Sequence, residues 1–155
     1  MSEARTEAAP QYHLLRDDNS WPDWCSRAAL VEFLHGTMQP YEDQPADIDN
    51  AITYAFSQEK YAGGFVMLVE LQGRLAGALV MLNTGMGGYV PENILLFVSV
   101  NPEMRGHGIG GELIRRCIEE CDGQVKLHVD FGNPAKRLYE RLGFEHVYDE
   151  MRYRR

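Results

Sequence analysis

Residues 105–110 have the types and spacing of a phosphate-binding loop. The stretch Arg105-Gly106-His107-Gly108-Ile109-Gly110 follows an apolar run, Ile94 to Val100, in which Ser99 alone is polar. Beyond the glycines, apolar residues at 113, 114, 117, 118 and 121 recur at helical spacing. Strand, glycine loop and helix in this order place free backbone N–H groups at the positive end of a helix dipole. Such a site favours an anionic phosphate or pyrophosphate.

A dinucleotide is one candidate ligand for this loop. Gly106, Gly108 and Gly111 have the spacing GxGxxG, and Asp130 follows about twenty residues later, where ribose recognition requires an acid. However, the first glycine lies well beyond the end of the apolar run, and only 44 of the 155 residues follow Gly111. That length is too short to complete a doubly wound sheet. The sequence therefore disfavours a nucleotide-binding oxidoreductase domain.

A second segment extends the pattern: Asn133-Pro134-Ala135-Lys136-Arg137-Leu138-Tyr139 is followed by Arg141-Leu142-Gly143-Phe144. Together the two motifs resemble the GNAT superfamily of N-acetyltransferases. The first is similar to the family's R/Q-x-x-G-x-G/A acyl-CoA loop, and the second to its N-x-A-x-x-x-Y-x-x-x-GF segment. The resemblance is close from about Phe65 to Met151. It implies a transferase that moves the acetyl group of acetyl-CoA directly to a primary amine in a ternary complex. The alternative is a non-catalytic acyl-CoA-binding sensor or interaction module of the same fold.

The resemblance also implies where the cofactor binds. Backbone N–H groups of the loop would hold the pyrophosphate, Asn133 would bond the pantetheine arm, and basic residues near the two motifs would supply positive charge. A backbone N–H in the apolar run would stabilise the charge that develops on the thioester oxygen. The expected cofactor-binding residues are Val98, Ser99, Val100, Arg105, Gly106, His107, Gly108, Ile109, Gly110, Asn133 and Lys136.

Two side chains are candidates for proton transfer. An amine with a pKa near 10.4 is neutral in roughly one molecule in two thousand at pH 7, so a base or a water chain must take its proton. Glu92 lies thirteen residues before Arg105, the offset at which the histone acetyltransferase branch of the family carries its base. Tyr139 stands where the family's general acid stands and would protonate the departing thiolate. Tyr41, Glu42, Tyr89, His128 and Asp130 are further candidates for contact with the acceptor.

Composition limits the other classes. The net charge of −8 disfavours nucleic-acid binding and suits a cationic acceptor, and no apolar run is long enough for a membrane span. Three cysteines form no closed disulfide framework and, without further ligands at suitable spacing, no metal site. They indicate buried thiols in a reducing cytoplasm, which is the expected location. Residues 1–10 read as a flexible tail and not as a signal peptide, and residues 11–155 as a single domain.

The elements expected to position these residues form a mixed α/β fold. Apolar patterning and punctuation predict strands at 12–16, 65–71, 75–83, 94–100, 125–130, 144–148 and 151–155, and helices at about 22–35, 45–60, 113–121 and 134–142. The pattern is that of a GNAT-type fold, with helices on both faces of a mostly antiparallel central sheet and a parallel fourth and fifth strand. Because few residues follow Phe144, the last two strands are either short or exchanged with a neighbour, so a homodimer stays open.

Overall fold

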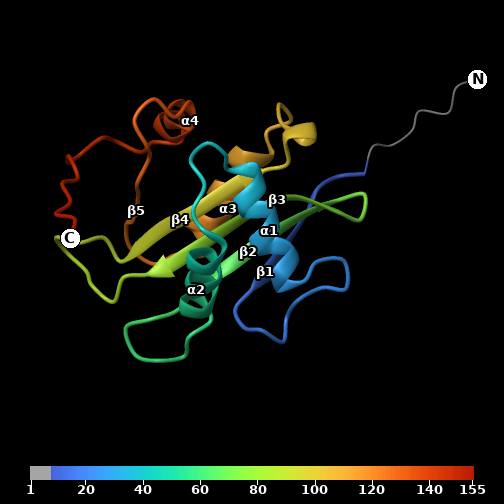
Figure 1. Cartoon of the computed structure of the whole chain (residues 1–155), viewed down its shortest axis with the longest axis horizontal. Helices are drawn as coiled ribbons and strands as arrows, with labels where there is room; N and C mark the ends of the chain where they lie inside the picture. The colour runs from blue at the N-terminus through green and yellow to red at the C-terminus, as the bar shows by residue number, and fades with distance from the viewer. Residues whose placement is uncertain (1–7) are drawn as a thin grey trace, which may run out of the picture.

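Five strands form a single sheet in residues 8–155, the part of the chain that the computed structural model describes (Figure 1). They lie side by side in chain order: β1 (Gln11–Leu15), β2 (Gly64–Leu71), β3 (Arg74–Asn83), β4 (Asn93–Val100) and β5 (Val125–Leu127). The first four strands pair antiparallel, and β5 pairs parallel to β4. The predicted fold class, with its parallel fourth and fifth strands, is therefore confirmed.

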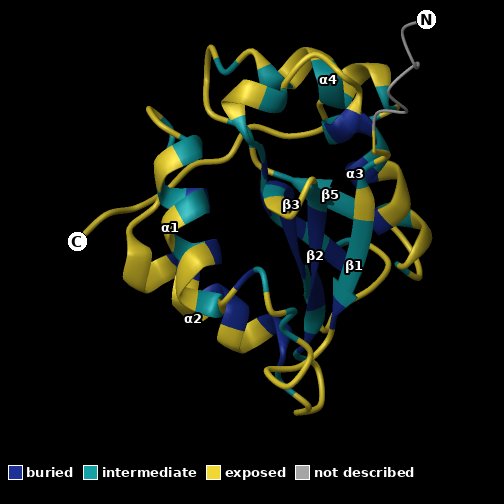
Figure 2. Ribbon diagram, turned by 90° about the vertical axis from the view of Figure 1, so that its right-hand side faces the viewer, coloured by how far each residue is buried: buried dark blue, intermediate teal, exposed yellow. Residues whose placement is uncertain are grey.

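Helices cover both faces of the sheet (Figure 2). On one face, α1 (Arg27–Thr37) and α2 (Pro45–Ala55) pack against alternate residues of the central strands, including Val66, Val80 and Phe97. On the other, α3 (Ile109–Glu119) packs against Met67, Leu79 and Leu95, with α4 (Ala135–Arg141) at its edge. Within residues 8–155, none of the helices combines the length and the apolar character that crossing a membrane requires.

Three helix boundaries differ from the sequence prediction, and one of them is the start of the third helix, which lies at Ile109 and not at 113. The first helix starts at Arg27 and not at 22, because the Ser26 hydroxyl accepts a 3.1 Å hydrogen bond from the Ala29 N–H and so caps the helix there. The second helix ends at Ala55 and not at 60. Its last residue is followed by Phe56, which leaves helical geometry and packs its side chain into the core between α2 and the sheet.

The strands predicted at 144–148 and 151–155 are wrong, and the predicted strand 125–130 ends at Leu127. A strand needs a neighbour whose backbone groups pair with its own. Because β5 is only three residues long, it offers too short an edge for a further strand. The segment after Phe144 instead runs past β5 without secondary structure (Figure 1), with His128 Nε2 at 3.6 Å from Glu150 Oε1.

Candidate functional site

The most informative feature of the sheet is the point at which β4 and β5 stop pairing. The parallel ladder consists of three residue pairs and ends at Leu95 with Leu127, although β4 continues to Val100. Just beyond that point, the β3–β4 register shifts: Met81 pairs with Leu95 and Val80 with Phe97. Leu96 is thus an extra residue, a β-bulge that bends the strand. The second half of β4 therefore has an open edge on the β5 side.

The hydrogen-bonding pattern shows which backbone groups face that open edge. The Asn101 N–H donates to the Ala76 carbonyl at 2.7 Å, so Asn101 directs its N–H toward β3. Because successive residues of an antiparallel strand direct their backbone groups to opposite sides, Val98 and Val100 direct theirs away from β3. No backbone partner for these two N–H groups is found among residues 8–155. Side chains alternate likewise: Val98 and Val100 face the α3 layer, and the buried Ser99 faces the α1 layer.

The loop that follows β4 is shaped by local hydrogen bonds and by two glycines. The Asn101 side chain accepts a 3.0 Å bond from the Glu103 N–H and caps the short 3-10 helix η1 (Pro102–Met104). Gly106 and Gly108 then adopt φ angles of +87° and +76°, which favour glycine. A Cβ added at either glycine would meet no atom within 4 Å. The loop therefore faces open space, and its glycines are required by backbone conformation and not by packing within the protein.

The helix after the loop presents unpaired donors to the same space. Gly108 is the N-cap of α3, no side chain caps this end, and the first intrahelical bond runs from the Glu112 N–H to the Gly108 carbonyl at 3.1 Å. The N–H groups of Ile109, Gly110 and Gly111 consequently have no intrahelical partner. His107 is exposed beside them. Loop and helix end together thus present backbone N–H groups to one open space.

The Arg105 side chain has partners that the sequence does not indicate. Its Nε donates to the Val100 carbonyl at 3.1 Å, and its Nη2 donates to the Thr37 carbonyl at 3.2 Å. Thr37 is the last residue of α1. Because every residue carries a backbone carbonyl, the sequence does not indicate that this one accepts a hydrogen bond from Arg105. Two donors of the guanidinium are thus engaged within the protein, and an anion at the loop depends mainly on backbone N–H groups.

The segment before α4 and the helix itself close one side of the loop. The Asn133 side chain accepts a 2.9 Å hydrogen bond from the N–H of Ala135, the first residue of α4, and Pro134 is the N-cap of that helix. Leu138 lies close to the start of α3: a Cβ on Gly110 would stand 3.6 Å from its Cδ2 and 3.5 Å from Cγ2 of Val100. The sequence motif and the loop are therefore neighbours in space.

Tyr139 is half-buried beside this contact. Its ring packs edge-on against Phe144, with 6.1 Å between ring centroids, and burial raises the pKa of its phenol above 10.0. No residue between 8 and 155 hydrogen-bonds its hydroxyl, and that hydroxyl is not among the buried polar atoms without a partner. A phenol that stays protonated at neutral pH and whose hydroxyl reaches solvent has the properties of a proton donor.

Glu92 lies at the opposite end of β4 from the loop. Its carboxylate accepts a hydrogen bond from the Gln124 N–H, just before β5, and this bond lowers the pKa of Glu92 below 4.5. The eight residues of β4 separate it from the loop, about 25 Å at 3.3 Å per residue. The expected base thus lies beside Gln124 at the start of the parallel pair, at the end of β4 remote from the glycine loop.

Positive charge near the loop comes from fewer residues than the sequence suggests. Arg115 and Arg116 both pair with Glu112, at 3.4 and 3.0 Å, so part of their charge is neutralised. Lys136 and Arg137 are exposed on α4, and no ion pair involves them within residues 8–155. The charges of these two side chains are therefore not neutralised by an ion pair within the described residues.

Several of the remaining candidates for acceptor contact lie on segments that come close to one another. Asp43, in the segment between α1 and α2, has a raised pKa because of burial and of the negative charges of Asp47 and Asp130. The Tyr89 and Tyr148 rings lie 6.1 Å apart. Glu42 has a buried carboxylate oxygen without a hydrogen-bond partner in the described residues. The α1–α2 segment, the β5–α4 loop, the glycine-rich β3–β4 loop and the C-terminal segment therefore meet here.

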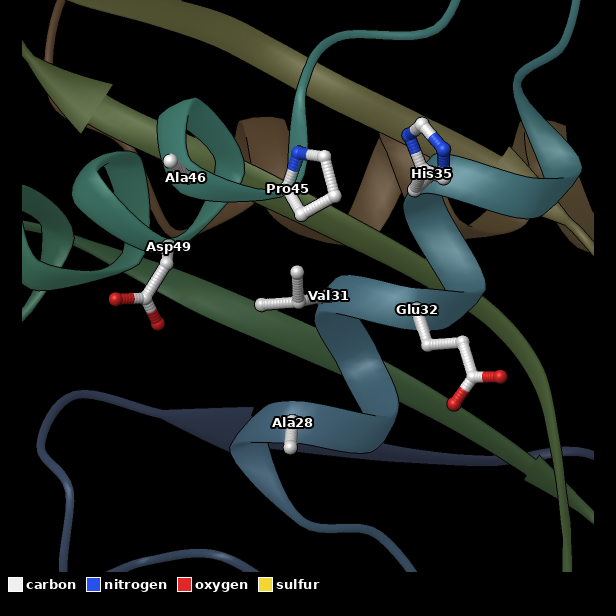
Figure 3. A pocket seen from close by; sticks show the side chains of 7 residues that line it. All are labelled: Ala28, Val31, Glu32, His35, Pro45, Ala46 and Asp49. Carbon is white, nitrogen blue, oxygen red and sulfur yellow. The ribbon is translucent and has the colours of Figure 1, made fainter.

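One surface hollow lies away from these residues. It is an open groove of about 460 Å³ between α1 and α2, and Figure 3 shows Val31, Glu32 and His35 on one wall and Pro45 and Asp49 on the other. None of the residues predicted to bind the cofactor lines it. The hollow is consequently a gap between two helices, and the loop and the open edge of β4 remain the candidate site.

Comparison with known proteins bears on this site. Residues 16–144 match the model of the Acetyltransferase (GNAT) family. The cysteine-rich protein 2-binding proteins of Homo sapiens and Mus musculus are 42% identical over 55 residues, which is 35% of this chain but only 7% of theirs. The chain thus spans a small part of these curated relatives.

Solved structures share the fold at low identity. An integron cassette protein of V. cholerae superposes with a TM-score of 0.65 and 16% identity, over 95% of this chain and 92% of its own. A ribosomal-protein-alanine N-acetyltransferase of Brucella melitensis superposes with a TM-score of 0.64 and 16% identity, over 95% of this chain and 99% of its own. Arabidopsis thaliana Naa50, in complex with the bisubstrate analogue CoA-Ac-MVNAL, superposes with a TM-score of 0.61 and 18% identity, over 91% of this chain and 86% of its own.

Proposed function

The chain belongs to the GNAT family of acetyltransferases, and we propose that it transfers the acetyl group of acetyl-CoA directly to a primary amine in a ternary complex. The observation that supports this most is the open edge of β4 beside the uncapped start of α3. The open edge of β4 offers backbone N–H groups to the acetylated pantetheine arm, and the start of α3 offers backbone N–H groups to the pyrophosphate.

The residues present fit acetyl-CoA. The loop of residues 105–110 faces open space and carries the donors that a pyrophosphate requires. The pantetheine arm contains two amides, and the Val98 carbonyl and the Val100 N–H, both directed away from β3, would pair with them as a neighbouring strand does. Lys136 and Arg137 would contact the nucleotide phosphate from α4. Acetyl-CoA supplies the thioester that the amine attacks.

The chemistry then needs stabilisation of one negative charge. When the amine nitrogen bonds to the thioester carbon, the carbonyl oxygen becomes an oxyanion. The Val98 N–H is our candidate donor to that oxygen, because it lies on the open edge just beyond the Leu96 bulge. One such donor lowers an acyl-transfer barrier by about 3–4 kcal/mol.

Proton transfer completes the reaction. As the C–S bond breaks, Tyr139 donates its phenolic proton to the CoA thiolate, and its raised pKa keeps it in the acid form at neutral pH. The amine nitrogen loses its protons to solvent water, directly or through a water chain that leads to Glu92, the expected base, and solvent returns one proton to Tyr139.

The acceptor is best sought first among peptide N-termini. Two of the solved structures carry names that refer to ribosomal-protein alanine and to an acetylated MVNAL peptide. A screen would incubate the protein with acetyl-CoA and amines, and detect free CoA with a thiol reagent. The panel would contain peptides beginning with alanine or MVNAL, then lysine, polyamines and aminoglycosides. The cationic acceptors suit the net charge of −8.

Thermal melts with acetyl-CoA, CoA and NADH test the proposal directly. We expect the two CoA ligands to raise Tm and NADH to leave it unchanged. Stabilisation by CoA ligands without thiol release for any amine would favour the non-catalytic sensor. No stabilisation by either CoA ligand would exclude both the enzyme and the sensor.

A further inference from the structure

Arg105 joins two parts of the protein that are distant in the sequence. Its guanidinium bonds the Val100 carbonyl at 3.1 Å and the Thr37 carbonyl at 3.2 Å. Val100 is the last residue of β4, and Thr37 is the last residue of α1. One side chain thus ties the start of the glycine loop to the end of the helix that leads into the α1–α2 segment, residues 38–44.

The chemistry of both partners suits an arginine in this position. The last carbonyls of a helix have no intrahelical donor and carry partial negative charge, so a cationic donor stabilises them. The planar guanidinium directs separate N–H groups at two acceptors, whereas a lysine ammonium acts as a single point charge. The Val100 carbonyl lies at the end of the open edge of β4, where it accepts a hydrogen bond from Arg105 Nε.

We propose that the Arg105 side chain is a positioning residue that couples the cofactor loop to the α1–α2 segment. This rests on the proposed function, in which residues 105–110 bind acetyl-CoA. A ligand that holds the loop also holds Arg105, and Arg105 then holds the end of α1 in place. Binding of acetyl-CoA therefore orders a segment that carries Tyr41, Glu42 and Asp43 and meets the β5–α4 loop.

The α1–α2 segment offers a readout that is independent of any acceptor. The Met38 N–H bonds the Leu34 carbonyl at 3.2 Å, and the Tyr41 N–H bonds the Met38 carbonyl at 2.8 Å. Exchange of such amides with deuterium requires local opening, and its rate reports the opening equilibrium. Hydrogen exchange of peptides covering 36–46 and 100–111, with and without acetyl-CoA, therefore follows both ends of the coupling at once.

The experiment compares wild type, Arg105→Ala, Arg105→Lys and a control, Arg74→Ala. Arg74 pairs with Glu103 of η1 at 3.0 Å with both side chains well exposed, so its loss should change little. In wild type and Arg74→Ala, we expect acetyl-CoA to slow exchange in both peptides, in 36–46 by about twofold to tenfold. In Arg105→Ala and Arg105→Lys, protection of 100–111 should remain and protection of 36–46 should be lost.

The outcomes separate the coupling from the proposed function. If acetyl-CoA protects neither peptide in wild type, the proposed function fails. If acetyl-CoA protects 100–111 but not 36–46 in wild type, the coupling is refuted and acetyl-CoA binding stands. The same conclusion follows if both Arg105 variants keep full protection of 36–46. Arg105→Lys keeps the charge and is exposed, so it also serves if Arg105→Ala does not fold. Steady-state kinetics with an identified acceptor provide a second test. In the Arg105 variants, the KM for the acceptor should rise by a larger factor than kcat falls.

Discussion

Replacing Gly108 by alanine tests whether the loop approaches a phosphate, and Gly88 offers a matched control. Both glycines have a φ of +76°, and at both an added Cβ would meet no atom of the protein within 4 Å. Gly108 caps α3, whereas Gly88 lies between β3 and β4, at the other end of β4. The two substitutions therefore impose the same backbone strain and the same added volume, in different surroundings.

The expected loss of stability is equal in the two variants. Placing a Cβ in the left-handed region costs about 1–2 kcal/mol. For a chain of this size, each kcal/mol lowers Tm by about 2–4 °C, so both variants should melt about 2–8 °C below wild type. Acetyl-CoA at a hundred times its Kd should stabilise the wild type by about 2.7 kcal/mol.

The two variants should differ in their response to acetyl-CoA. A methyl group at Gly108 stands in the open space in front of the loop and displaces the pyrophosphate from at least one charge-assisted hydrogen bond. Loss of one such bond weakens binding by between about tenfold and 150-fold. At the same ligand concentration, the Tm shift of Gly108→Ala should therefore be about half the wild-type shift or less, and that of Gly88→Ala should be unchanged. Calorimetric titration gives Kd directly.

Equal responses in the two variants would refute the reasoning. If acetyl-CoA stabilises Gly108→Ala as strongly as Gly88→Ala, the pyrophosphate does not lie against this residue, whatever else the protein binds. A lower Tm in Gly108→Ala alone, with unchanged Kd, would show that the glycine serves only the start of α3.

Three further predictions concern the acid, the β4–β5 junction and the core. Tyr139→Phe should lower kcat at least about tenfold with little change in the Kd of acetyl-CoA, because burial raises the pKa of Tyr139 and keeps its phenol protonated at neutral pH. An unchanged kcat would exclude the acid role. Glu92→Ala should lower Tm at pH 7; because the folded pKa of Glu92 lies below its ordinary value, this difference from wild type should vanish as pH falls below 4.5. Ile114 is completely buried under the sheet, so Ile114→Ala should cost about 2–5 kcal/mol in urea unfolding, and a value below about 1 kcal/mol would contradict the packing described for α3.

The sequence alone was sufficient for the elements whose signals are local. Apolar runs predict the central strands, and the glycines after Val100 predict the loop, although α3 begins at Ile109, before the predicted residue 113. Asn133 and Gly143 correctly bracket α4. Such features depend on residues within a few positions of one another, and periodicity and turn chemistry record them directly.

The partner of Glu92 shows what sequence spacing does not reveal. The offset of Glu92 from Arg105 predicts a base, and the structure adds that its carboxylate bonds the Gln124 N–H, 32 residues further along the chain. The strands expected after Phe144 are absent because their formation also depends on long-range pairing. Their sequence suits a strand, but whether a strand forms depends on the edge beside it, and β5 is too short to provide one.

Only the tertiary structure decided how the site is assembled. The early end of β5 pairing, the Leu96 bulge and the bond from Arg105 to the Thr37 carbonyl all involve backbone groups brought together from distant positions. Every residue carries the same backbone N–H and carbonyl, so a sequence does not distinguish a paired group from an open one. The motifs identify the loop, and long-range pairing determines which donors it leaves free.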